Sequence, residues 1–348
     1  MARPSELRRK IDSLLNEYEP IIRNAFLLSI IDIRSLITLK LLVERLERHD
    51  INGALDALNL ERAAFSRVEN AIATAYNAGG TAMTGNMPIL RDINGARVVV
   101  RFDARNLRAE GWLRSHSSGL VTRIIDDQRA GIRAALETGL SQGQNPNRVA
   151  LDIVGRINRA TGKREGGLIG LTAPQSEYVA AARAELLSGD PAPLRNYLAR
   201  GRRDKRFDRA VLRALKDGTP LDAATIDQII GRYSDRLLEL RGRMLARTET
   251  LTSIHAAKYE GFRQGLEKTN YPPEAVTRVW RSASDSKVRH THAAMNGQEV
   301  QGLDTPFQSP SGAMLRYPGD TGLGAGADEV AGCRCDDDLR IDFSWGVV

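Results

Sequence analysis

The chain has 348 residues, a formal net charge of +7 and a sequence pI near 9.6. A chain of this length can bury a sizeable core and is expected to hold two or three domains. Charged residues make up 27% of it and aromatic residues 5%, which excludes a disordered protein and indicates a polar globular one. The positive balance favours acidic partners, nucleic acid first among them. The 42 Arg against 8 Lys suit bidentate phosphate contacts, although a GC-rich coding bias gives the same excess.

No segment is predicted to cross a membrane or to direct secretion. A membrane span needs roughly 20 nearly uncharged residues, whereas the most apolar stretch, residues 21–43, is interrupted by Arg23, Asp32, Arg34 and Lys40. The N-terminus lacks the apolar core of a secretory signal. The two cysteines lie too close in sequence to link domains. We therefore expect a soluble protein that is made in a reducing cytoplasm and has no membrane partner.

Residues 1–106 are predicted to form an N-terminal helical region with a short β-hairpin. Apolar residues recur there at helical spacing, beginning with Leu7, Ile11 and Leu14. The run Asn-Ala-Gly-Gly at 77–80 is expected to stop the last of these helices. The stretch Asp-Ile-Asn-Gly at 92–95 lies between two extended runs and indicates the hairpin turn.

Residues 107–204 are predicted to form a middle helical region. Pro146 and Pro174 suit first helical positions, and Thr172 suits the cap before the second of them. Further on, an apolar stripe from Ile226 to Met244 predicts one or two long helices over residues 222–265. Short extended pieces with many glycines then follow. The expected fold class is therefore mainly α, with long helices and a small C-terminal α+β domain.

The last third of the chain carries an ordered set of short motifs. In order these are Arg247 and Glu249 within Ala-Arg-Thr-Glu-Thr, an extended run ending at Trp280, then Asp285, Arg289, His292, Gly297, Phe307, the turn Pro318-Gly319-Asp320, and Cys333-Arg334-Cys335. In this order the set resembles the phage Mu F-like head morphogenesis domain of minor head proteins in tailed bacteriophages and prophages. The resemblance runs from about Arg206 to Asp337, so we expect residues 205–348 to form a Mu F-like domain.

The resemblance implies a non-enzymatic minor head protein that acts in procapsid and head assembly. It implies association with the portal protein and with capsid or scaffold proteins. It also implies a location in the virion, in the capsid interior or at the portal vertex, after synthesis in the bacterial host cytoplasm. Contact with packaged double-stranded DNA is compatible with the +7 charge. The long N-terminal helices, which the motifs do not cover, are expected to face the portal or scaffold.

His292, Cys333 and Cys335 form the candidate metal site. Imidazole and thiolate are the usual ligands of zinc, but a Cys-x-Cys pair is tighter than the spacing typical of structural zinc sites. Such a site would leave one coordination position open, or fill it with His290 or Asp285. Alternatively, both thiols pack as small buried hydrophobic groups and His292 hydrogen-bonds to the backbone. No other cofactor is expected.

Asp285, Arg289 and His292 are spaced four and three residues apart, which would place them on one helical face. One interpretation is acid–base chemistry in which Asp285 orients His292. The other is an Asp–Arg ion pair that pins a turn, with His292 stacked against Trp280. The sequence contains no recognisable activated nucleophile, metalloprotease motif or phosphate-binding loop, so no catalytic residue is expected.

The remaining members of the motif set are expected to be structural. Arg247 and Glu249 lie among small residues at the base of a long helix. Charged groups in such a setting are expected to be at least half-buried, each with a partner elsewhere, and to lock the helix against the C-terminal domain. Trp280, Asp285, Arg289 and Gly297 complete this structural set.

A basic run offers the best candidate surface for DNA or another acidic partner. It consists of Arg202, Arg203, Lys205, Arg206 and Arg209, with Arg200 and Arg213 at its ends and only Asp204 and Asp208 as counter-charges. A solvated linker is the alternative. Two other function classes stay open at this point. One is a metal-dependent hydrolase or toxin-like domain using His292, Cys333 and Cys335, and the other is a non-specific DNA-binding protein.

Overall fold

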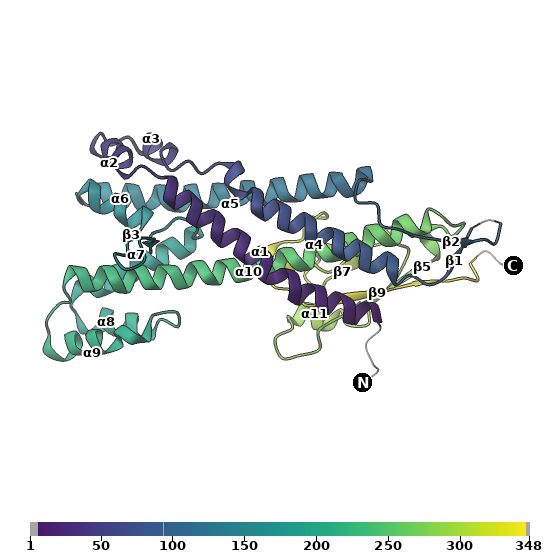
Figure 1. The fold of residues 1–348 in the computed structure, drawn as a ribbon. Coiled ribbons are helices and arrows are strands. Elements are labelled where there is room, and N and C mark those ends of the chain that lie inside the picture. The colour runs from purple at the N-terminus through teal and green to yellow at the C-terminus, as the bar shows by residue number, and fades with distance from the viewer. Residues whose placement is uncertain (1–5, 93, 346–348) are drawn as a thin grey trace. The chain divides into compact units, whose positions relative to one another are not determined.

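The computed structural model describes residues 6–92 and 94–345, and it confirms a mainly α fold with small sheets near the C-terminus (Figure 1). The described residues form two compact units, each assembled from separate stretches of the chain. We call the first the sheet unit, from residues within 1–24, 68–117 and 243–348. The second, the helical unit, comprises residues 25–67 and 118–242. These units do not follow the three consecutive regions expected at 1–106, 107–204 and 205–348, because α1 (Glu6–Leu36), α5 (Leu107–Ser141) and α10 (Ala223–Leu266) each contribute to both.

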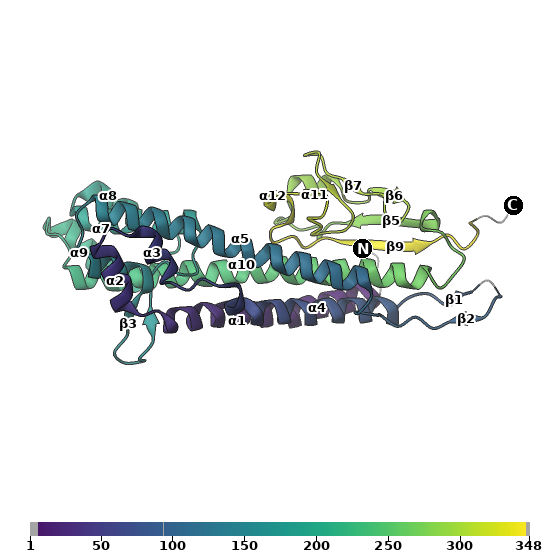
Figure 2. The same cartoon turned by 90° about the horizontal axis from the view of Figure 1, so that it is seen from above.

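The sheet unit contains the only three-stranded sheet among the described residues. Its antiparallel strands run in the order β6 (Glu299–Gln301), β5 (Val276–Arg281), β9 (Asp336–Ile341). Figure 2 shows β9 running beside the C-terminal half of α10. The other elements of this unit are α4 (Ser66–Gly85), β1 (Leu90–Arg91), β2 (Arg97–Val98), η3 (Pro273–Ala275), α11 (His290–Ala294), β7 (Phe307–Gln308), β8 (Met314–Leu315) and α12 (Ala327–Val330).

The helical unit is built from short helices around the remaining parts of the long ones. These are α2 (Leu39–Glu47), α3 (Ile51–Asp56), η1 (Arg62–Phe65), α6 (Pro146–Val154), α7 (Ala173–Ser188), α8 (Pro191–Ala199), η2 (Lys205–Phe207) and α9 (Asp208–Asp217), with the ribbon β3 (Arg156–Ile157) and β4 (Arg164–Glu165). Pro146 lies in the first turn of α6. Thr172 caps α7 through a reciprocal capping box with Gln175, with Pro174 in the first turn, as predicted.

The predicted helix stop at residues 77–80 is wrong. Helix α4 continues through Gly79 and Gly80 to Gly85, and both glycines are buried. A Cβ on Gly79 would lie 2.7 Å from the backbone oxygen of Ile254 in α10, and one on Gly80 would meet the ring of Phe102. These glycines therefore allow α4 to approach its neighbours closely, and a packing requirement of this kind is not visible in the local sequence.

The long helix predicted over residues 222–265 is a single element, α10. Its apolar stripe is buried from Ile226 to Leu237, but Met244 at the end of the predicted stripe is 45% exposed. The predicted hairpin is present with shorter strands, since β1 pairs with β2. Ile93 of its turn lies outside the described residues. Within the described part of the chain, no helix is both long and apolar enough to cross a membrane.

Candidate metal centre

His292, Cys333 and Cys335 lie together in the sheet unit, although about 40 residues separate the histidine from the thiols. Helix α11 carries His292, and the turn between α12 and β9 carries both cysteines. The two thiols belong to a buried apolar cluster that includes Trp280 of β5 and Phe307 of β7. The two thiols thus lie in a core, as the packing alternative expected.

The three side chains present their ligand atoms to one another. Nδ1 of His292 lies 3.4 Å from the Sγ atom of Cys333 and 3.4 Å from that of Cys335. The backbone N–H of Cys335 also donates to the Sγ atom of Cys333 over 3.4 Å. All three side chains are buried. His292 thus contacts thiols and not the backbone, so the expected backbone hydrogen bond is wrong.

Glu329 of α12 lies beside Nε2, the second ring nitrogen of His292. Its Oε2 atom lies 2.8 Å from Nε2 of His292. Its Oε1 atom accepts hydrogen bonds from Ser309 (2.9 Å) and Ser311 (2.6 Å). Burial alone would raise the pKa of Glu329, but these hydroxyl donors and His292 outweigh it and lower the pKa below its usual value.

The two thiols have opposite acidities. The hydrogen bond between them, together with His292, lowers the pKa of Cys333 well below that of an ordinary thiol, in spite of burial. The same bond and burial raise the pKa of Cys335. Two sulfur atoms and an imidazole nitrogen that face one another are a donor set suited to a thiophilic cation.

Asp285, Arg289 and His292 do not share a helical face, because α11 begins only at His290. Asp285 pairs with Arg334, the residue between the two cysteines, and this contact lowers the pKa of Asp285 to about 2. An aspartate–arginine pair does pin this turn, but its arginine is not Arg289.

Arg289 and Gly297 instead shape the backbone around α11. The guanidinium of Arg289 donates to the carbonyl oxygen of Glu329 over 2.9 Å and to that of Ala331. Gly297 has a φ of +85°, and its N–H donates to the carbonyl of Trp280. Trp280 meets His292 edge-on, with ring centroids 5.2 Å apart. These motif residues therefore determine where His292 and the cysteine turn lie.

Glu249 of the Ala-Arg-Thr-Glu-Thr motif has the buried partner that was expected. Its Oε2 atom lies 2.6 Å from Nε2 of His116 in α5, and the His116 ring stacks on Trp112 at 4.4 Å. Arg247 is half-buried, and no ion pair of its guanidinium occurs among the described residues. The motif thus joins α10 to α5 within the sheet unit through Glu249.

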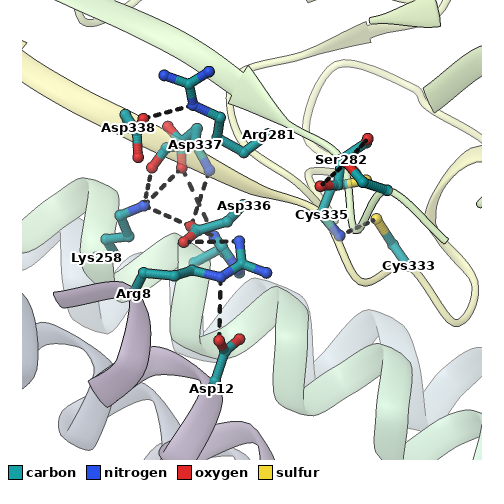
Figure 3. A network of polar contacts seen from close by, with 12 residues as sticks. Arg8, Asp12, Lys258, Arg281, Ser282, Cys333, Cys335, Asp336, Asp337 and Asp338 are labelled. Atoms are coloured by element: carbon teal, nitrogen blue, oxygen red, sulfur yellow. Dashed lines mark hydrogen bonds and ion pairs between the residues drawn. The ribbon is translucent and has the colours of Figure 1, made fainter. Parts of the chain in front are cut away.

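A second buried polar cluster was not predicted. Nζ of Lys258 in α10 lies 2.7 Å from Oδ1 of Asp336 and 3.0 Å from Oδ1 of Asp337 (Figure 3). Arg8 of α1 reaches Asp336 at 3.1 Å, and Nδ1 of His255 lies 3.5 Å from the same carboxylate. Because Lys258 neutralises the carboxylates that a metal ion would need, this cluster is an ion-pair network. Its sequence signal was the run of three aspartates directly after Cys335, together with a lysine inside a long helical segment.

The basic run is partly neutralised within the helical unit. Arg203 forms a bidentate pair with Asp208, and Arg206 pairs with Asp204 at 2.6 Å. Arg202, Lys205 and Arg209 are exposed, and no ion pair of theirs is found in the described part of the chain. The run therefore offers fewer free cations than its sequence indicated.

A cavity of about 1010 Å³ lies within the helical unit. Its walls include Val149 and Val179, and Arg183 at its edge pairs with Asp152 (2.9 Å) and Asp227 (2.7 Å). It contains none of the residues predicted as sites.

Comparison with protein-family models gave a match over residues 205–336, to the family described as Phage Mu protein F like protein. This segment begins where the third predicted region begins, and it includes His292 and both cysteines. Comparisons with curated proteins and with solved structures found no match. Residues 205–336 of this chain are thus similar to the Phage Mu protein F like family, in agreement with the resemblance carried by the ordered motifs.

Proposed function

We propose that this chain is a non-enzymatic minor head protein of a tailed phage or prophage, which acts in procapsid assembly beside the portal protein. The match of residues 205–336 to the Mu F-like family carries this proposal. The protein would reside in the virion, in the capsid interior or at the portal vertex, and would contact capsid or scaffold proteins there.

The use of charged groups in the sheet unit supports a structural role. Glutamate, lysine and arginine are residue types that often act in catalysis. Here Glu249, Lys258 and Arg289 each contact a partner inside the protein. Buried charges with fixed partners specify geometry, and removing one partner is costly. An assembly protein needs a fixed shape of this kind at its interfaces.

Helix α1 carries an apolar surface that suits a portal protein as partner. Leu28 and Ile31, one helical turn apart, are 43% and 46% exposed. Two exposed apolar side chains on one face of a helix can pack against a partner protein. Removing residues 1–80 would not test this surface, because Tyr76 belongs to the core of the sheet unit together with Ala256 and Phe262 of α10.

Substitution of the exposed residues tests the portal contact without disturbing a core. The double variant Leu28→Gln/Ile31→Gln is expected to lose co-purification with the portal protein of the same phage, while its urea midpoint stays that of the parent. The matched control is Lys40→Gln/Glu44→Gln, an exposed pair in α2, which should keep the portal. Undiminished portal binding by Leu28→Gln/Ile31→Gln would overturn the assignment of this surface.

A second candidate function, non-specific DNA contact, is favoured by α9. Arg209, Arg213 and Lys216 occur at offsets of four and three on this helix and are all exposed. Ion pairs of these three side chains are absent from residues 6–92 and 94–345. They therefore form one cationic face that can follow a phosphate backbone.

The salt dependence of binding to double-stranded DNA tests this face. Replacing one phosphate-contacting cation, as in Arg213→Gln, should reduce the slope of log K against log salt by about 1. Arg101→Gln removes an exposed arginine of the sheet unit and serves as the charge-matched control. Equal slopes for both variants, or binding that salt does not weaken, would argue against DNA contact through α9.

A further inference from the structure

We propose that His292, Cys333 and Cys335 bind one Zn²⁺ ion through Nδ1 and the two Sγ atoms, with a solvent molecule as the fourth ligand. This inference concerns the sheet unit alone and does not depend on the assembly role. The ion would fasten the turn that precedes β9 to α11, and so close the C-terminal part of the Mu F-like segment.

The spacing of the three donor atoms fits the ion. Zinc lies about 2.3 Å from thiolate sulfur and about 2.0–2.1 Å from imidazole nitrogen, so a tetrahedral site places sulfur and nitrogen roughly 3.5 Å apart. Nδ1 of His292 is 3.4 Å from the Sγ atom of Cys333 and the same distance from that of Cys335. The donors thus stand at coordination distance from one another without rearrangement of the backbone.

The His292 imidazole has a carboxylate beside its second ring nitrogen, as zinc-bound histidines usually do. A metal-bound histidine generally gives its second ring nitrogen to a carboxylate, which fixes the tautomer and the ring orientation. Here the carboxylate of Glu329 is the neighbour of Nε2, at 2.8 Å, and Ser309 and Ser311 donate hydrogen bonds to its other oxygen. A histidine that merely filled the core would not need a buried carboxylate with two hydroxyl donors of its own.

The cysteine turn is held independently of any ion. Arg289 binds two carbonyl oxygens of the segment that leads into the turn, and Arg334 binds Asp285 across it. The N–H of Cys335 already donates to the Sγ atom of Cys333, a contact that stabilises a thiolate. Zn²⁺ binds cysteine as thiolate, so binding would release thiol protons to solvent.

Neither residue considered as a fourth ligand joins the site. His290 is exposed, and Asp285 is paired with Arg334. Among the described residues, the group that can reach one ion here is His292, Cys333 and Cys335. A four-coordinate ion held by these three residues would take its fourth ligand from solvent.

Metal analysis and cobalt substitution of the full-length protein test the proposal. The chain is purified without chelator, under a reductant that contains no thiol, and then dialysed with Zn²⁺ or Co²⁺ alone. We expect one ion per chain, and the Co²⁺ form should show the intense ultraviolet absorption of thiolate-to-cobalt charge transfer. Cys333→Ser, Cys335→Ser and His292→Gln should each lose the stoichiometric ion, and Glu329→Gln should bind it about 10–100-fold more weakly.

His290→Gln is the matched control, because it removes an exposed imidazole two residues from His292 on the same helix. This variant should bind Zn²⁺ as the parent does. A folded parent chain that takes up no ion, or a Co²⁺ form without thiolate absorption, would overturn the proposal even if the variants fail to fold. Unchanged affinity in His292→Gln would overturn it as well.

Discussion

Lys258 shows how a single buried charge can hold separate segments together. Its ammonium group is fully buried and lies between the carboxylates of Asp336 and Asp337, and Arg8 reaches Asp336 from α1. Helix α10, strand β9 and helix α1 thus meet at one set of ion pairs (Figure 3). A buried ion pair adds little net stability compared with apolar packing. Loss of one partner, however, leaves the other as an unpaired buried charge.

Replacing the lysine should therefore be severe. We expect Lys258→Met to lower the free energy of unfolding by about 3–5 kcal/mol, because two buried carboxylates lose their main cation. Arg340→Met is the matched control. Arg340 lies on the same strand as the two aspartates, but its side chain is 61% exposed and its contact with Asp338 spans 4.0 Å. It should cost less than about 1 kcal/mol. Urea unfolding of both variants measures the difference, and equal losses would contradict this account of the network.

The same network predicts that the stability of the fold depends on pH. Burial alone would raise the pKa of Asp336 and Asp337, but the charge of Lys258 outweighs it and lowers both pKa values. A depressed carboxyl pKa contributes stability above the unfolded pKa of about 3.9, and that stability is lost as pH falls through the folded pKa.

Without Lys258, burial and the neighbouring Asp336 carboxylate should raise the pKa of Asp337, while Arg8 still pairs with Asp336, so the direction of the pH dependence reverses for Asp337. The parent should lose stability below about pH 4, whereas Lys258→Met should gain stability relative to the parent as pH falls from neutrality towards that point. Urea midpoints across this range test the reversal. A stability gap between parent and variant that stays constant with pH would contradict it.

At the scale of single residues, the sequence indicated which residues form a site better than it indicated which side chains they contact. It grouped His292, Cys333 and Cys335 correctly, since their types already indicate shared chemistry. It could not predict that Glu329 would hold His292, because an acidic residue in a short turn has no local signature. It paired Asp285 with the wrong arginine for a related reason. Arg334 is adjacent to Asp285 only after β9 has paired with β5.

At the scale of elements, helix packing decided what local sequence could not. Periodicity predicted α10, because this helix carries a long, regular apolar stripe. It failed at Gly79 and Gly80, where glycine usually ends a helix but here lets two helices approach. Two helical glycines of the sheet unit distinguish helix propensity from close packing. Gly79 is packed against Ile254, whereas Gly111 of α5 has open space around its Cα.

Alanine substitution should act in opposite directions at these two positions. Gly111→Ala is expected to raise the free energy of unfolding by up to about 1 kcal/mol, since alanine favours the helix and meets no neighbour. Gly79→Ala should lower it by about 1–3 kcal/mol, because the new methyl group overpacks against the backbone of α10. Thermal or urea unfolding measures both changes. Stabilisation by Gly79→Ala would show that the close contact is not required.

At the scale of the whole molecule, the family could be predicted from sequence but the compact units could not. The ordered motifs from Arg247 to Cys335 indicated the Mu F-like family, and the match over residues 205–336 agrees with them. The two units interleave distant stretches, because three long helices contribute to both, and linear composition does not encode such sharing. A minor head protein built in this way would present its N-terminal helices as parts of the folded units and not as a separate arm.

The most direct test of the central proposal is cross-linking mass spectrometry, with quantification, on purified and DNase-treated particles from the host strain. The proposal predicts that the chain is present in a few copies per particle and is cross-linked to the portal protein. Cross-links from the segment around Leu28 and Ile31 of α1 would identify the docking surface. Absence of the chain from both mature particles and procapsids would contradict a role as a minor head protein.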